Sequence, residues 1–292
     1  MRINKFMFWL TRRLLRQYYR TTKLFYKSAN HFFDKRGLRN SSSLAFTATL
    51  AFIPLSIALA NISQIMPFSR RITEGVQQYF LNDYIPQSGG ELYRIVTLSI
   101  QHSAQLSWFS FILLIASCYG VLFEIQDLFN IMSYRKLKVK FSRSILRFSL
   151  FFIIGPFFVY ALGYINQAVN ELTDFHFQRV LVSVTSWIFT FGVFIALYKF
   201  IPVQKILFRH AVVVGLAAGT VFLSLQEYFI YSIKELKENY QLLYGSLAML
   251  PIFLLWIYLS TFILLFGIQV IYTWEKYFTS HNYGTNKKTV TD

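Results

Sequence analysis

Long apolar runs alternate with short polar segments along most of this sequence. Each run exceeds 18 residues, enough for a helix to cross a hydrocarbon core of about 30 Å. The runs cover residues 44–65, 108–132, 145–169, 180–201, 211–233 and 247–272. Because a helix satisfies its own backbone hydrogen bonds in lipid, the pattern predicts an all-α polytopic membrane protein with about six transmembrane helices.

Residues 1–40 have a different pattern, with basic side chains at helical spacing. These side chains recur every three or four positions at Arg12, Arg16, Arg20, Lys23 and Lys27. Apolar residues fall on the other face, which predicts an amphipathic helix. Such a helix can lie flat on the cytoplasmic leaflet with its cations on anionic lipid, or it can pack on the transmembrane core with its basic face in water. The sequence leaves both positions open.

The remaining chain divides into a membrane domain and a tail. We expect the six helices within residues 41–275, with residues 66–107 forming a small helical loop on the outer face. Residues 276–292 are polar and are expected to be a cytoplasmic tail.

Charge distribution predicts how the chain is oriented. The formal net charge is +16, yet only 14% of residues are charged and 55% are hydrophobic. Eleven of the 29 Lys and Arg residues lie in the first 40 positions, and six lie within residues 135–147. Placing both termini in the cytoplasm puts 23 basic residues on that side and six on the other. This follows the bias of basic residues toward cytoplasmic loops and argues against nucleic acid as the partner.

Ionisable residues inside the predicted spans are the first candidates for function, since burying a charge in lipid is costly. Glu124 and Asp127 lie one turn apart in the second span, and Glu227 lies in the fifth. The acidic pair could instead form structural ion pairs with Arg135, Lys136 or Arg147. Glu227 either faces a polar cavity or bonds a neighbouring helix.

Uncharged polar residues add to this candidate interior. They are Asn130, Asn166, Gln167 and Gln269. Amides in a helix bundle also hold helices together without touching a substrate. Gly215 and Gly219 have GxxxG spacing, which predicts close approach of another helix.

Catalytic and cofactor motifs are not found in the sequence. The five histidines are scattered without metal-ligand spacing, and no Walker-type glycine loop occurs. The single cysteine, Cys118, lies in an apolar run. We therefore expect no metal, no cofactor and no enzymatic activity.

Four stretches carry a family resemblance. They are residues 40–54, 124–130, 197–202 and, most specifically, 240–258. These stretches resemble the YihY/BrkB-like inner-membrane proteins over roughly residues 38–275. The resemblance implies a bacterial inner-membrane protein with six helices. Family members often carry a glutamate soon after the glycine of the last span, where this chain has Gln269 after Gly267.

The resemblance leaves several functions open. Family members have carried the name ribonuclease BN, but this sequence lacks the metal ligands of a nuclease centre. We expect a transporter or lipid-handling protein of the bacterial envelope, with membrane lipids as partners. The alternative is a non-transporting scaffold that docks an envelope protein through residues 66–107. Assembly into a homo-oligomer is compatible with either function.

Overall fold

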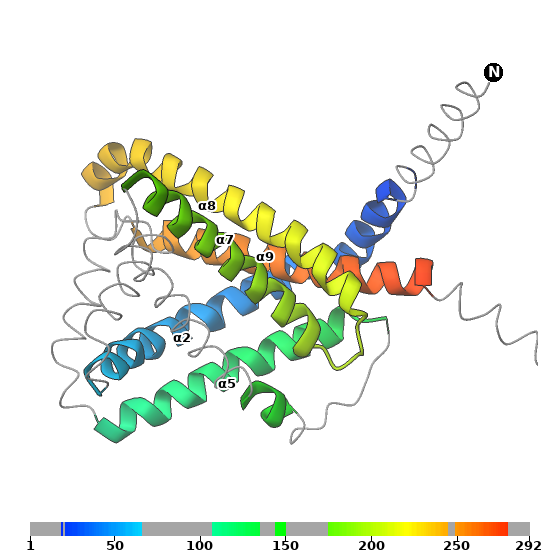
Figure 1. Ribbon diagram of the computed structural model, residues 1–292, viewed down its shortest axis with the longest axis horizontal. Helices are drawn as coiled ribbons and strands as arrows, with labels where there is room; N and C mark the ends of the chain where they lie inside the picture. Colours follow the sequence, from blue (N-terminus) through cyan, green and yellow to red (C-terminus); the bar gives the residue numbers. More distant parts are fainter. Residues whose placement is uncertain are drawn as a thin grey trace, which may run out of the picture.

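The computed structural model describes residue 19 and residues 21–65, 107–134, 144–149, 175–244 and 249–279. Every regular element in these ranges is helical (Figure 1). The α-helices are α2 (Gly37–Ile65), α5 (Ser107–Met132), α7 (Phe175–Phe200), α8 (Phe208–Tyr244) and α9 (Met249–Trp274). A π-helical segment, η4 (Glu275–Thr279), continues α9. Residues 21–34 and 144–149 are also helical.

Five of the six predicted runs coincide with helices. The starts of α2 and α7 lie several residues before the predicted runs, and α5 and α9 agree with theirs within about two residues. Only residues 144–149 of the third run are described, and they are helical. Residues 66–106 of the expected outer loop and the tail after residue 279 lie outside the described ranges.

Helix α8 continues 11 residues beyond the predicted run and ends at Tyr244. The extension contains charged residues at 234, 235, 237 and 238, which ended the apolar run. Lys, Glu and Leu favour helix strongly, and residues 234–244 contain no Gly or Pro. The apolar run therefore predicted too short a helix. The helix propensity of residues 234–244 explains why α8 continues beyond that run.

Helix α9 forms the centre of the bundle. It packs on α2, α5 and α8, while α2 packs on α5 and α7 packs on α8 (Figure 1). Buried residues from α5, α7, α8 and α9 form one continuous core that includes Phe129, Tyr198 and Leu265. The large apolar content of α9 follows from this position, because several of its faces contact other helices.

Three glycines allow α7 to approach α8 and α9 closely. A Cβ atom at Gly215 would lie 2.6 Å from the Ile195 side chain, and one at Gly219 would lie 2.6 Å from the Phe191 ring. The predicted close approach at these α8 glycines is therefore confirmed. Gly267 of α9 does the same for Tyr198, whose hydroxyl occupies the space of the missing side chain. That hydroxyl donates to the Leu264 carbonyl at 3.2 Å.

A tight corner joins the helix of residues 21–34 to α2. Arg36 has a φ of 56°, a left-handed conformation that non-glycine residues adopt rarely. Asn40 Nδ2 donates to the Lys35 carbonyl at 3.0 Å and fixes the corner. Gly37 leaves room for the ring of Phe32, which is fully buried against Phe262 and Phe266 of α9. The described part of the N-terminal helix therefore packs on the bundle.

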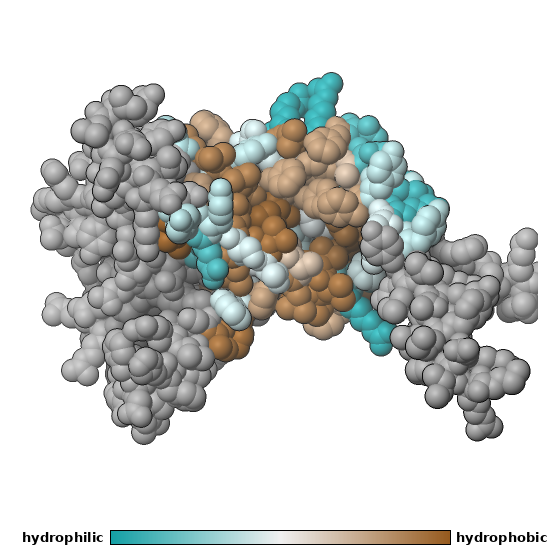
Figure 2. Space-filling view, turned by 90° about the horizontal axis from the view of Figure 1, so that it is seen from above, coloured by the Kyte–Doolittle hydropathy of each residue, from teal (hydrophilic) through white to brown (hydrophobic). Residues whose placement is uncertain are grey.

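Much of the described surface is apolar. Large apolar side chains are exposed on all five α-helices, among them Leu50, Ile112, Trp187, Val221 and Leu255. Figure 2 shows a broad apolar area across one face, with polar side chains toward the right-hand side and a smaller polar group to the left of the apolar area. Within the described ranges, Phe208–Tyr231 and Phe253–Tyr277 are long and apolar enough to cross a membrane.

Candidate functional site

Basic side chains gather where α5, α7 and α9 end and where α2 and α8 begin. We call this the basic end of the bundle. Its described cations are Lys27, Lys35, Arg36, Arg39, Arg147, Lys199, Lys205, Arg209 and Lys276. Several polar contacts between the described helices lie at this end.

The predicted residues of α5 have separate surroundings. Glu124 is half-buried, and its Oε1 accepts a hydrogen bond from Ser43 Oγ of α2 at 2.8 Å. Asp127 is exposed and Asn130 is half-buried. Arg147, one of the expected partners of the acidic pair, donates to the Pro202 carbonyl at 2.9 Å. Arg135 and Lys136 lie outside the described residues.

The other predicted residues are distributed over the bundle. Glu227 is exposed on α8, and its 19-residue separation from Phe208 corresponds to about 28 Å along the helix. Gln269 is fully buried in α9. Asn166, Gln167, Arg12, Arg16 and Arg20 lie outside the described residues. Lys23 is exposed over the ring of Tyr19.

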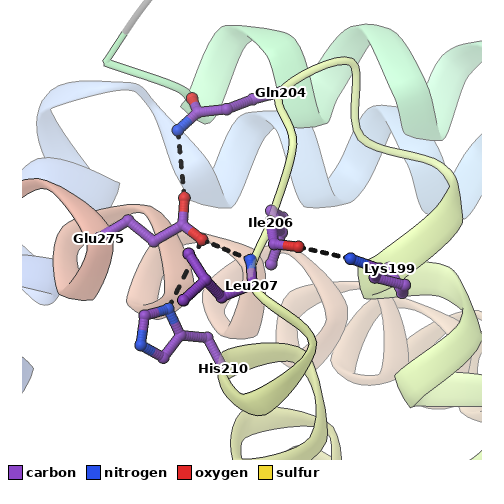
Figure 3. A network of polar contacts seen from close by, with 6 residues as sticks. All are labelled: Lys199, Gln204, Ile206, Leu207, His210 and Glu275. Carbon is purple, nitrogen blue, oxygen red and sulfur yellow. Dashed lines mark hydrogen bonds and ion pairs between the residues drawn. The ribbon is translucent and has the colours of Figure 1, made fainter. Parts of the chain in front are cut away.

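Glu275 organises one polar cluster at the basic end, which we call the Glu275 network (Figure 3). Its Oε1 accepts from the Leu207 backbone N–H at 2.9 Å, just before α8 begins. Its Oε2 accepts from Gln204 Nε2 at 3.2 Å, and Gln204 Oε1 accepts from Ser133 Oγ at 2.9 Å. The carboxylate thus joins the ends of α5, α8 and α9, at the helix N-terminus where negative charge is favoured.

His210 and Lys199 complete the Glu275 network. The His210 ring stacks on Trp274, with centroids 4.7 Å apart, and its Nδ1 lies 3.5 Å from Glu275 Oε1. That separation is an ion-pair distance when the histidine is protonated and is too long for a good hydrogen bond. Lys199 Nζ donates to the Ile206 carbonyl at 2.6 Å, which fixes the connection between α7 and α8.

A second polar group lies beneath the N-terminal helix. We call it the α9 strip, made of Gln269, Thr273 and Tyr134. Thr273 Oγ1 donates its only proton to the Gln269 carbonyl at 2.8 Å and accepts from Gln269 Nε2 at 3.2 Å. The Tyr134 hydroxyl, 3.3 Å from the same oxygen, must therefore be a donor.

The α9 strip ends inside the protein at an unpaired atom. Gln269 Oε1 is fully buried and has no hydrogen-bond partner. Since Thr273 cannot donate to it, turning the amide over would not improve the pairing. An unpaired buried acceptor costs about 1–3 kcal/mol, so it requires an explanation.

The α9 strip meets a cluster of cations and aromatic rings at the protein surface, at the basic end of the bundle. We call this end of the strip its outer end. We call this cluster the collar, made of Lys27, His31, Lys276 and Tyr277. The His31 ring contacts the Tyr134 ring at 4.0 Å, and Lys276 Nζ lies 3.8 Å from the centre of the Tyr134 ring. Lys27 Nζ lies 3.6 Å from the centre of the Tyr277 ring. The collar therefore links the N-terminal helix to η4.

Burial and charge alter the titration of two residues here. Burial lowers the pKa of His31, and the nearby charges of Lys35 and Lys276 lower it further, against opposing effects of its own backbone hydrogen bond and Asp34. Burial raises the pKa of Tyr134, with a smaller opposing effect from its bond to Thr273. Both shifts favour neutral side chains in a positively charged neighbourhood.

Comparison with known proteins identifies the family. The family model described as virulence factor BrkB matches residues 28–291. The chain belongs to the BrkB family. The predicted resemblance is thus confirmed, and the matched range includes the α9 strip, the Glu275 network and all of the collar except Lys27.

Curated relatives are named membrane proteins. A UPF0761 membrane protein of Psychrobacter sp. (strain PRwf-1) is 28% identical over 262 residues, covering 87% of this chain and 48% of the relative. One from Azotobacter vinelandii is 26% identical, covering 82% and 60%. One from Histophilus somni is 26% identical, covering 86% and 90%. The chain spans about half to three-fifths of the first two relatives. No solved structure matches.

This BrkB-family membrane protein has polar residues that sequence reasoning missed. Five residues of the Glu275 network and the α9 strip were not among the site residues predicted from the sequence: Glu275, His210, Gln204, Tyr134 and Thr273. One signal was present: Gln269, Thr273 and Tyr277 are spaced by four residues, which places successive polar groups on one side of a helix. Gln126 was missed too; it is 1% exposed, and neither amide atom has a hydrogen-bond partner.

Proposed function

We propose that this protein is a six-span inner-membrane protein that handles lipid or a similar amphiphile and performs no catalysis. Its two termini lie in the cytoplasm in this proposal. The topology is supported by the basic end, because cytoplasmic segments of membrane proteins are enriched in Lys and Arg. It is also supported by helices at five of the six predicted runs.

The α9 strip is the observation that carries the proposal. It runs from the collar, where Lys276 and Tyr277 are exposed, to the fully buried and unpaired Gln269 Oε1. A polar headgroup that entered between the N-terminal helix and α9 would find hydrogen-bonding groups along this line. A donor on that headgroup would satisfy the Gln269 oxygen, which the folded chain leaves unpaired.

The apolar surface fits the same proposal. Exposed apolar side chains on α8 and α9 would contact acyl chains while the headgroup follows polar residues. Six helices are few for a transporter that rocks two halves around a closed cavity. Movement of a headgroup along the side of α9 needs no such halves.

Gln269→Leu in vesicles containing purified protein tests the proposal. We expect movement of a labelled phospholipid between leaflets with native protein and at least a tenfold slower rate with Gln269→Leu. The matched control is Gln126→Leu, the same change at another fully buried and unpaired amide of a different helix. Equal rates for native protein and Gln269→Leu, or equal losses in both variants, would contradict the proposal.

The scaffold alternative depends on residues 66–107, which lie almost entirely outside the described part of the chain. A cellular assay separates it from lipid handling. If replacing these residues abolishes function while Gln269→Leu has no effect, the protein acts as a scaffold.

A further inference from the structure

Two lysines from distant parts of the sequence share one tyrosine ring in the collar. Lys27 Nζ is 3.6 Å and Lys276 Nζ is 5.1 Å from the centre of the Tyr277 ring. Lys27 belongs to the N-terminal helix and Lys276 to η4. The fold, and not sequence proximity, therefore brings these two positive charges together.

The neighbourhood increases the positive charge. Lys35 and Lys276 both act electrostatically on His31, one turn after Lys27 in the same helix. Glu275, the acidic residue adjacent to Lys276, directs its two oxygens to Gln204 and the Leu207 backbone. Asp34 is the acid that acts on His31 from the N-terminal helix. Among the described residues, two lysine ammonium groups thus lie over the Tyr277 ring, and a third, that of Lys35, acts on His31.

Cation–π contacts account for only part of this arrangement. Such contacts contribute about 0.5–1 kcal/mol each at exposed sites, and Lys276 and Tyr277 are both exposed. Repulsion between two ammonium groups on one ring opposes that gain. A negatively charged group between them would turn the repulsion into two charge-assisted hydrogen bonds.

Donors around the ring suit a phosphate. Both ammonium groups carry several N–H donors. The collar also lies where the apolar sequence of α9 ends, since the charged residues Glu275 and Lys276 follow Trp274 directly. Lipid phosphates lie at this boundary between apolar and polar surroundings.

We propose that the collar binds the phosphate of an anionic phospholipid between Lys27 and Lys276, at the outer end of the α9 strip. The headgroup would thereby be held where the polar strip begins. This inference deepens the proposed function by naming the charge class of the lipid. It concerns equilibrium binding, so it can hold for a protein that moves no lipid.

Native mass spectrometry of the full chain in detergent tests the binding. The probes are short-chain phosphatidylglycerol and short-chain phosphatidylcholine, titrated separately. We expect tighter binding of phosphatidylglycerol, weakened about 25-fold in Lys27→Gln/Lys276→Gln, since each lysine near an anionic surface contributes about fivefold. Lys27→Arg/Lys276→Arg retains the charges and should bind within about threefold of native protein.

The matched control removes two other cations from the same end. Lys205 and Arg209 are both exposed near the start of α8, and Lys205→Gln/Arg209→Gln changes the net charge equally. We expect this control to weaken binding less than twofold. Equal weakening in the two glutamine variants would show diffuse attraction and overturn the site, as would equal binding of the two lipids.

A soluble competitor distinguishes a lipid from a free phosphate compound. Glycerol phosphate carries the same phosphate chemistry without acyl chains. We expect it to compete only at concentrations far above those of phosphatidylglycerol. Competition at equal concentrations would overturn the assignment to a lipid.

Discussion

The Glu275 carboxylate and the Gln269 amide both belong to the end of α9 but differ in how their oxygens are paired. Both Glu275 oxygens accept hydrogen bonds, and these bonds join three helix ends. The α9 strip instead ends at the unpaired Gln269 Oε1. Buried carboxylate oxygens that accept hydrogen bonds from several helix ends are typical of groups that stabilise a fold, whereas a buried oxygen without a partner requires an explanation. In the proposed function a bound headgroup supplies it for Gln269. The comparison separates a structural cluster from a candidate path.

Loss of Glu275 should have the largest effect on stability. Glu275→Ala leaves Gln204 and the Leu207 N–H without their acceptor, and we expect a loss of about 2 kcal/mol in the free energy of unfolding. Unfolding by SDS titration in mixed micelles measures it. Glu275→Gln keeps a carbonyl acceptor and should lose roughly half as much. If Glu275→Ala unfolds like native protein, the network does not hold the helix ends.

Removing the Tyr134 hydroxyl should have a smaller effect. Tyr134→Phe deletes one donor to Thr273 but leaves Thr273 bonded to Gln269. No buried polar atom therefore loses its last hydrogen-bond partner. We expect a loss of about 1 kcal/mol or less by the same titration. A loss as large as that of Glu275→Ala would mean that the strip stabilises the fold as the network does.

Gln269→Leu should leave stability nearly unchanged. The substitution removes the unpaired oxygen, and Thr273 retains the Gln269 backbone carbonyl and Tyr134 as partners. Burying an apolar side chain of similar size is expected to be neutral or to stabilise by up to about 1 kcal/mol. Clear destabilisation would place Gln269 among the structural residues and remove the main support for the proposed function.

The smallest expected effect is a pH dependence from His31. Its pKa is below the ordinary value of 6.5 in the folded protein, chiefly through burial, so the unfolded chain binds more protons below that pH. The contribution of His31 to stability is therefore present above about pH 6.5 and is lost as the pH falls through the lower folded pKa. Thermal unfolding at a series of pH values should show a shallower acid dependence for His31→Gln. Identical slopes would contradict the burial of this ring.

The sequence determined the class of this protein. Runs of apolar residues in α2, α5, α7, α8 and α9 require helices, because each residue between their ends must satisfy its own backbone hydrogen bonds in apolar surroundings. The GxxxG spacing of Gly215 and Gly219 similarly predicted a close helix contact. The four stretches of family resemblance predicted membership in the BrkB family, which the match over residues 28–291 confirms.

Only the tertiary structure decided which polar residues act together. Glu275, Gln204 and Ser133 come from three parts of the chain, and Lys27 and Lys276 are nearly its whole length apart. Apolar periodicity reports which face of a helix is buried, but it carries no information on which helix covers that face. Gln269 was identified from sequence as a polar residue in a span. Its unpaired oxygen, its bond to Thr273 and its place beneath the N-terminal helix required the packing of α9.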